Sequence, residues 1–412
     1  MNVMNARLSV MMFLQFFIWG GWFVTLGTFL TTTLAASGGQ VGMAFSTQSW
    51  GAIIAPFFVG LIADRFFNAE RILAVLHLLG AVLLFQLYRA ADFSAFYPYV
   101  LAYMLVYMPT LALVNAVAFR QIKDPAREFS RIRVWGTIGW IVAGIVISFG
   151  FAWDAQQTIA AGGLRNTFLM SAVASLVLGL YSFSLPKTAP LKSTTDTPGI
   201  KQMAGMDALG LLKDRSYLVF FLASILICIP LAFYYQNANP FLAEIGVTNP
   251  TAKMALGQVS EVLFMLLLPL FIQRFGIKIA LLVGMLAWAL RYVLFAYGNN
   301  GDQAFMLLIG IALHGVCYDF FFVCGQIYTD AKAPERFRSS AQGLITLATY
   351  GVGMLIGFWV AGQITDHFTA QNGHNWRSIW LFPAGFSVVV LLCFALAFKS
   401  RGGEKEGMPS TV

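Results

Sequence analysis

Charged side chains are scarce in this chain of 412 residues. Asp, Glu, Lys and Arg make up 11% of it and hydrophobic residues 58%, whereas a soluble domain carries about 25% charged residues. Residues 8–63 contain no charged side chain, which leaves room for two spans of about 20–25 residues each. The apolar runs are continuous and not alternating, which favours helices over a β-barrel. Composition therefore excludes a soluble fold and predicts an all-α integral membrane protein.

Cysteine is also rare. The four cysteines, Cys228, Cys317, Cys324 and Cys393, all fall in apolar runs. Cys317 and Cys324 share a predicted helix but lie about 10 Å apart along its axis, which is too far for a disulfide. The sequence has no metal-ligand spacing either. We therefore expect neither a disulfide framework nor a metal site.

Twelve apolar runs are long enough to cross a bilayer. They are residues 9–33, 42–63, 72–91, 97–119, 132–153, 165–185, 217–238, 254–273, 278–298, 303–328, 339–364 and 378–398. The first run is too long for a signal peptide and predicts a retained helix. If the N-terminus is cytoplasmic, 21 Lys and Arg residues lie inside and four outside. This asymmetry predicts that both termini are cytoplasmic, and it accounts for the net charge of +8 without nucleic-acid binding.

The longest polar segment divides the chain into two halves of six runs each. We predict an N-terminal six-helix bundle at 1–185, a cytoplasmic basic linker at 186–216, a C-terminal six-helix bundle at 217–398 and a cytoplasmic tail at 399–412. Parallel six-helix repeats place a substrate site between the halves, near the middle of the membrane.

Two acids, Glu261 and Asp319, lie inside apolar runs. A carboxylate at mid-membrane costs roughly 2.5–3.5 kcal/mol, so such residues persist mainly where they line a polar path or find a partner. We interpret them as substrate or proton sites. The alternative is a structural ion pair, for which Arg291 in the ninth run is a candidate partner.

Polar residues recur at helical spacing in three runs, so each set shares one helix face. The sets are Arg133, Thr137 and Trp140; Gln258 and Glu261; and His314 and Tyr318, with Asp319 next to them. The polar members bind hydroxyl groups, and tryptophan and tyrosine rings stack on flat apolar faces. A small, uncharged, polyhydroxylated solute with a planar ring, such as a nucleoside, fits this combination. Each set has a plainer interpretation: Arg133 in the cytoplasmic basic cluster, Trp140 in packing, His314 in a helix contact.

Five polar or aromatic residues lie near the outer end of the seventh run: Tyr234, Tyr235, Gln236, Asn237 and Asn239. They are candidates for the lining of an outer vestibule. An aromatic belt at the membrane interface explains them equally well. The spacing of His314 and Asp319 also matches an acyltransferase pattern, but inside a membrane span we expect no enzyme and no catalytic residue.

The loop Gly60-Leu-Ile-Ala-Asp64-Arg65 resembles the loop signature of the major facilitator superfamily, in which acid and base tie neighbouring helix ends together. Residues 10–398 resemble the nucleoside:proton symporters of that superfamily, the bacterial nucleoside permeases. The segments that carry this resemblance are Phe17-Ile-Trp19-Gly-Gly-Trp22, Tyr107-Met-Pro109-Thr110, Ile132-Arg133-Val-Trp135-Gly-Thr137, Gln258-Val-Ser260-Glu261, Trp288-Ala-Leu-Arg291 and Asp319-Phe-Phe.

The resemblance implies a major facilitator fold of twelve helices that imports nucleosides with protons, by alternating access, across the inner membrane. The energy source would be the proton gradient, with no cofactor, and nothing demands an oligomer, so we expect a monomer. It implies that Arg133, Thr137, Gln258 and Glu261 bind the nucleoside, largely through its ribose. It also implies that Asp319 couples protons, with Glu261 as a second candidate.

The chain departs from this family at several candidate positions. His314 stands where better-known members have tyrosine, and Trp140 and Tyr318 stand where phenylalanines are expected. In the seventh run the family's amides align with Ala232 and Tyr235, and the nearest amides here are Gln236 and Asn237. A symporter for a sugar or another small polyol is therefore one alternative, and a non-transporting membrane sensor is another.

Overall fold

Helices make up nearly all of the chain that the structure describes. The structure is a computed structural model and describes residues 3–58, 67–122, 125–189, 206–335, 338–371 and 373–399. Contacts divide it into two compact units, Met1–Pro198 with Tyr235–Ala255, and Gly199–Tyr234 with Leu256–Val412. The helix α11 contributes to both units, because its last ten residues pack with the first.

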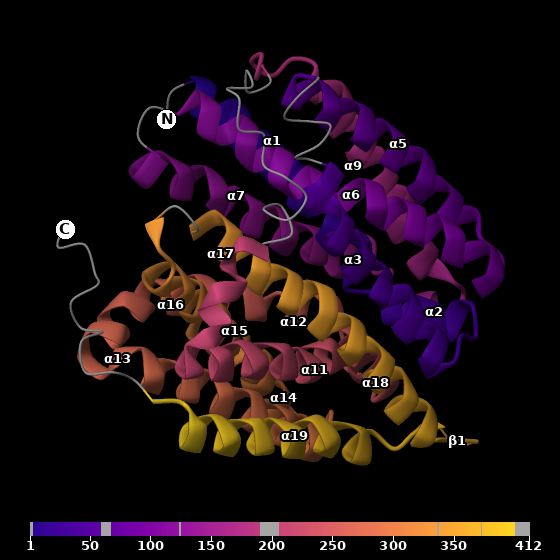
Figure 1. Cartoon of the computed structure of the whole chain (residues 1–412). Helices are drawn as coiled ribbons and strands as arrows, with labels where there is room; N and C mark the ends of the chain where they lie inside the picture. Colours follow the sequence, from indigo (N-terminus) through magenta and orange to yellow (C-terminus); the bar gives the residue numbers. More distant parts are fainter. Residues whose placement is uncertain are drawn as a thin grey trace. The chain divides into compact units, whose positions relative to one another are not determined.

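The first unit is built from helices of the N-terminal part of the chain (Figure 1). These are α1 (Val3–Phe23), α2 (Leu26–Thr33), α3 (Gly38–Phe58), α5 (Ala69–Arg89), α6 (Phe93–Gln121), α7 (Pro125–Ile145), η2 (Val146–Gly150), α8 (Gln156–Ala160), η3 (Gly163–Arg165) and α9 (Asn166–Ser182), with the end of α11 (Arg215–Glu244) and α12 (Pro250–Met254).

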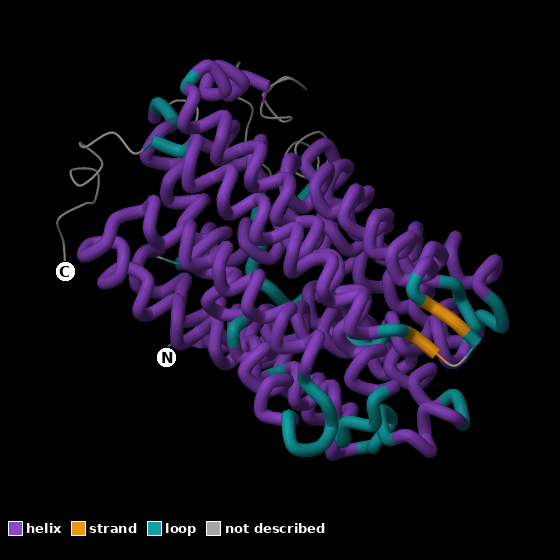
Figure 2. The backbone as a smooth tube through the Cα atoms, turned by 90° about the horizontal axis from the view of Figure 1, so that it is seen from below, coloured by secondary structure: helices purple, strands orange, loops and turns teal. Residues whose placement is uncertain are grey.

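The second unit contains the start of α11 and the remaining helices. These are η4 (Met206–Lys213), α13 (Leu256–Tyr297), α14 (Ala304–Ala312), α15 (His314–Tyr318), η5 (Asp319–Val323), α16 (Cys324–Lys332), α17 (Arg338–Thr346), η7 (Leu347–Gly353), α18 (Met354–His367) and α19 (Trp376–Ala397). Two short antiparallel strands, β1 (Thr369–Ala370) and β2 (Gly373–His374), pair Thr369 with His374. They stand out as the orange segments of the tube in Figure 2.

Ten helical segments among the described residues are long and apolar enough to span a membrane. The predicted eighth and ninth runs form the single element α13, which a break at Gly276 (φ 79°, ψ 167°) divides. Glycine tolerates this left-handed φ because it has no Cβ. The predicted second run coincides with α3 as far as Phe58, and its remainder lies outside the described residues.

Close backbone approach holds the helices of the first unit together. α1 packs against α7 and α9, α5 against α6 and α9, and α3 against α6. A Cβ on Gly139 of α7 would lie 2.2 Å from the carbonyl oxygen of Phe13 in α1, and one on Gly51 would lie 2.6 Å from the carbonyl oxygen of Met104. Small residues at such crossings are what packing between membrane helices requires.

Residues 235–255 are bound to the first unit through polar contacts. Thr28 donates its hydroxyl hydrogen to Oδ1 of Asn239 at 2.5 Å. Oδ2 of Asp154 accepts hydrogen bonds from the hydroxyl of Ser148 at 2.6 Å and from the backbone N–H of Thr251 at 3.0 Å. Side chains of the first half of the chain therefore fix the end of α11 and the start of α12.

The outer surface of the helices is apolar, as a lipid environment requires. Leu396 is 84% exposed, Leu266 71% and Trp359 66%. Many other large apolar side chains are exposed as well, and large exposed apolar surfaces are rare in soluble proteins. This surface supports the membrane assignment made from composition.

Candidate substrate and proton site

The candidate residues fall into two groups, one in each unit. Gln258, Glu261, His314, Tyr318 and Asp319 belong to the second unit. Arg133, Thr137, Trp140, Tyr235 and Gln236 belong to the first.

His314 is at the centre of the group in the second unit. Its Nδ1 lies 3.1 Å from Nη1 of Arg291, and its Nε2 lies 4.0 Å from Oε2 of Glu261. Arginine has no acceptor, so Arg291 donates and Nδ1 of His314 accepts. The imidazole of α15 therefore lies between a cation and an acid that both belong to α13.

Aromatic rings enclose the guanidinium of Arg291, which is fully buried. Its Cζ lies 3.4 Å from the centre of the Tyr234 ring, and the rings of Trp288 and Phe295 are at 5.6 and 5.7 Å. The His314 ring is stacked on Tyr234 with centroids 5.3 Å apart. Ring faces attract a cation, most strongly where water is excluded. Tyr234 thus supports both Arg291 and His314.

Backbone contact between α15 and α13 brings His314 and Glu261 together. A Cβ on Gly315 would lie 2.5 Å from the carbonyl carbon and oxygen of Ser260. The N–H of Gly315 donates to the hydroxyl of Ser260 at 3.0 Å, and that hydroxyl donates to the carbonyl of Gly257. Because Gly315 and Ser260 are the chain neighbours of His314 and Glu261, this contact sets the spacing between the two side chains.

Asp319 is the first residue of the π-helical segment η5 and has no exposed surface. Neither carboxylate oxygen has a hydrogen-bond partner among the described residues. π-helical turns are rare and often occur at functional sites. Burying a carboxylate without a partner has a large desolvation cost, which binding a proton removes.

Tyr318 and Gln258 extend this group. The hydroxyl of Tyr318 shares a hydrogen bond with that of Tyr350 in η7, and its ring lies 5.9 Å from His314. Gln258 is half-buried, one helical turn before Glu261. The second unit therefore places an acid, an imidazole and a phenol close together.

The group in the first unit combines a cation with a wall of aromatic rings. Cζ of Arg133 lies 4.1 Å from the centre of the Phe16 ring. The ring of Trp140 lies 5.6 Å from that of Trp19, which is also 5.6 Å from Tyr107. Gly20 makes room for Trp140, since a Cβ there would lie 3.0 Å from the indole.

One hydrogen bond and one half-buried hydroxyl complete this wall. The hydroxyl of Tyr107 donates to the carbonyl of Gln15 at 2.7 Å, which fixes α6 against α1. Thr137 is half-buried, one turn from both Arg133 and Trp140. All three residues lie in the helix α7, as the helical spacing in the sequence predicts.

Tyr235 and Gln236 lie in the part of α11 that packs with the first unit. Nε2 of the fully buried Gln236 donates to the carbonyl of Gly38 at 3.3 Å. The ring of Tyr235 meets that of Phe23 edge-on at 5.9 Å. The amide of Gln236 thus already holds the start of α3.

Other predicted sites can be placed more briefly. Gly60, Asp64 and Arg65 of the loop signature lie outside the described residues. Within the described part of the chain, no three His, Cys, Asp or Glu side chains gather in a way that could hold a metal ion.

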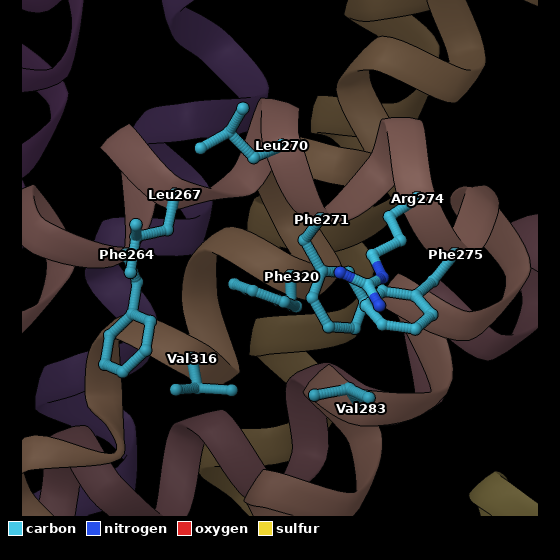
Figure 3. A pocket seen from close by; sticks show the side chains of 9 residues that line it. All are labelled: Phe264, Leu267, Leu270, Phe271, Arg274, Phe275, Val283, Val316 and Phe320. Carbon is cyan, nitrogen blue, oxygen red and sulfur yellow. The ribbon is translucent and has the colours of Figure 1, made fainter.

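A separate apolar cavity of about 430 Å³ lies against α13 and η5 and contains none of the candidate residues. Its lining is Phe264, Leu267, Leu270, Phe271, Arg274, Phe275, Val283, Val316 and Phe320. Figure 3 shows the guanidinium of Arg274 beside the rings of Phe271 and Phe275. Its Cζ is 5.5 Å from the centre of the Phe275 ring.

Comparison with known proteins identifies the family. A family model described as nucleoside H+ symporter matches residues 1–402. The chain belongs to the nucleoside H+ symporter family. Among curated relatives, YegT of Escherichia coli (strain K12), provisionally named a nucleoside transporter, is 43% identical over 97% of this chain and 95% of its own length. Xanthosine permease of the same organism is 34% identical over 95% of each chain.

A solved nucleoside transporter has the same fold. The crystal structure of the nucleoside transporter NupG matches this chain with a TM-score of 0.87 and 29% identity, covering 97% of this chain and 100% of NupG. The architecture is thus a helical, major facilitator-like fold, and the protein is a transporter and not an enzyme.

Several residues of the two groups were not predicted as site residues. Phe16, Trp19 and Tyr107 are aromatic residues in apolar runs, where they look like lipid-facing or packing residues. Tyr234 is predicted only as a residue of the outer vestibule, and not as a contact of Arg291. Trp19 and Tyr107 belong to segments that resemble the symporter family, and this was the available signal. The contact of Tyr234 with Arg291 joins residues 57 positions apart in sequence, and no spacing rule reveals it.

Proposed function

We propose that this protein imports nucleosides together with protons by alternating access. The observation that carries the proposal is the grouping in one unit of Glu261 and His314, which can bind hydroxyls, with Asp319, which is buried and has no hydrogen-bond partner among the described residues. Membership of the nucleoside H+ symporter family and the likeness to NupG and xanthosine permease support it.

The polar residues are proposed to bind the ribose. Arg133, Thr137, Gln258 and Glu261 offer donors and acceptors to hydroxyl groups, and charged hydrogen bonds are about twice as strong as neutral ones. The aromatic wall of Trp140, with Trp19 and Tyr107 beside it, would take the flat face of the base.

Asp319 is proposed to carry the coupled proton, and Glu261 is the second acid able to take part. Coupling requires that a proton change the affinity for substrate in one state more than in the other. Asp319 is favoured because it is fully buried and its carboxylate has no hydrogen-bond partner among the described residues, whereas Glu261 is 23% exposed.

We further propose the membrane organisation that the sequence predicts. Twelve helices would form bundles at 1–185 and 217–398, joined by a cytoplasmic linker at 186–216 and followed by a tail at 399–412, with both termini in the cytoplasm. The protein would act as a monomer in the inner membrane with the proton gradient as its energy source. The distribution of Lys and Arg supports this orientation.

Uptake by proteoliposomes tests the function. Radiolabelled uridine and adenosine should accumulate when an inward proton gradient is imposed, and a protonophore should collapse the accumulation. Vesicles with folded protein that take up neither nucleoside would contradict the proposal. Uptake of a sugar or polyol under the same gradient would then identify the alternative substrate class.

A further inference from the structure

Arg291 contacts His314 in the second unit, and the only role predicted for it from the sequence is that of a charge partner for a buried acid. Its guanidinium is fully buried, between the ring of Tyr234 and the imidazole of His314. Because aromatic rings enclose it, any influence on a bound solute would pass through His314.

The contact with Arg291 determines where the proton of a neutral His314 resides. Guanidinium N–H groups only donate, so Nδ1 of His314 must present its lone pair at 3.1 Å. The ring hydrogen of the neutral imidazole is then on Nε2, the nitrogen that faces Oε2 of Glu261. His314 is thereby held as a donor directed at an acid.

The gap between His314 and Glu261 has a size that fits one oxygen atom. At 4.0 Å the two side-chain atoms are too far apart to hydrogen-bond each other. An oxygen placed about 2.8 Å from each atom can accept from Nε2–H and donate to the carboxylate. A hydroxyl group does both, and Glu261, 23% exposed, leaves the gap accessible.

We propose that Arg291 is a positioning residue that fixes His314 as the Nε2–H tautomer, so that His314 and Glu261 bracket one hydroxyl of the substrate. The inference rests on the proposed nucleoside transport, and it names how one ribose hydroxyl is recognised. With the hydrogen on Nδ1 instead, two acceptors would face each other across the gap and the hydroxyl could satisfy only one.

Nitrogen NMR tests the tautomer without any transport measurement. The chain has four histidines, so the spectrum of ¹⁵N-histidine-labelled protein is assigned by its difference from that of His314→Gln. We expect Nε2 protonated and Nδ1 unprotonated in the wild type, and a mixture of tautomers in Arg291→Met. A wild-type signal from Nδ1–H or from imidazolium, or an unchanged signal in Arg291→Met, would overturn the proposal.

Competition by deoxynucleosides tests the bracketed hydroxyl. Radiolabelled uridine uptake is competed with uridine and with 2′-, 3′- and 5′-deoxyuridine. In the wild type one analogue should compete about 10-fold less well, the loss expected for one hydrogen bond to a charged group. In Arg291→Met the ratio between the apparent affinities of uridine and that deoxy analogue should fall towards 1. Arg291→Lys, which keeps a donor, should restore the ratio.

A purely structural role for Arg291 predicts a different result. Arg291→Met would then reduce uptake with the ratio between uridine and its deoxy analogues unchanged, and this outcome would refute the proposal. Arg377→Met is the matched control, because Arg377 also lies on a tyrosine ring, Tyr297 at 4.7 Å, but is exposed; its ratios should equal those of the wild type. Absence of all nucleoside uptake in the wild type would contradict the proposed function, while the NMR result would still decide the tautomer.

Discussion

Asp319 and His314 are both buried polar side chains in neighbouring turns, but they differ in their polar contacts. His314 has Arg291 on one ring nitrogen and Glu261 near the other. Asp319 has no hydrogen-bond partner among the described residues. A group already held by partners is suited to binding a solute, whereas an unsatisfied acid is suited to taking up and releasing a proton.

Replacing Asp319 by asparagine should separate transport from proton coupling. Asparagine has nearly the same shape but does not bind the proton, so Asp319→Asn should still exchange nucleoside across the membrane while losing accumulation driven by a proton gradient. Counterflow and gradient-driven uptake in the same proteoliposome preparation measure the two activities.

Asp302→Asn is the control for this substitution, because Asp302 is an exposed acid just before the same helical segment. It should accumulate nucleoside as the wild type does. Full accumulation by Asp319→Asn would show that another group, with Glu261 the first candidate, carries the proton.

The sequence identifies single site residues where a side chain is energetically unfavourable in its surroundings, or where helical spacing groups polar residues. Glu261 and Asp319 stand out because charge is expensive in an apolar run, and the helical period grouped Arg133 with Trp140. Tyr234 has no such cost, so nothing marked it as the support of Arg291. Its role depends on a contact between helices, which follows from packing and not from the residue itself.

At the scale of elements, glycine contacts set how closely the helices approach. Gly315 brings α15 against the backbone of Ser260. We expect Gly315→Ala to separate α15 from α13, because the new methyl group would lie 2.5 Å from the carbonyl of Ser260, and a backbone atom cannot move aside as a flexible side chain can. Overpacking of this kind costs typically 1–3 kcal/mol, and the shift would also widen the gap between His314 and Glu261.

Thermal unfolding and uridine competition measure the two effects of Gly315→Ala, a lower Tm and a weaker apparent affinity. Gly385→Ala is the matched control, since a Cβ on this glycine of α19 meets nothing within 4 Å. It should leave both quantities unchanged. A Gly315→Ala protein with wild-type Tm and affinity would mean that α15 and α13 do not depend on this contact.

Helix positions and the break between the eighth and ninth runs follow from run length and charge, but the irregular turns inside a run do not. The run from 254 to 298 was divided at 273–278 because Arg274 and Lys278 are charged, and the break lies at Gly276 between them. The π-helical turns η2, η5 and η7 had no sequence signature, since an extra residue in a turn does not alter apolar composition. One of them, η5, begins at Asp319, so the π-helical backbone at the candidate proton site could not be predicted from the sequence.

At the scale of the whole molecule, the distribution of basic residues is the strongest statement about orientation. Lys and Arg are retained on the cytoplasmic side of a membrane, and the asymmetry of 21 to four is large for a chain with only 26 such residues. The segment 299–303 should therefore face the outside and the segment 333–335 the cytoplasm.

Cysteine labelling in intact cells tests this orientation. Cys393 is the exposed cysteine among the four and is first replaced by serine. In that background Asn300→Cys should react with a membrane-impermeant maleimide, because the loop before α14 faces outward, whereas Glu335→Cys should react only after the cells are permeabilised. Both positions are exposed, so permeabilised cells should label them equally and serve as the control. The opposite pattern would reverse the orientation and place the basic linker outside, against the charge distribution on which the topology rests.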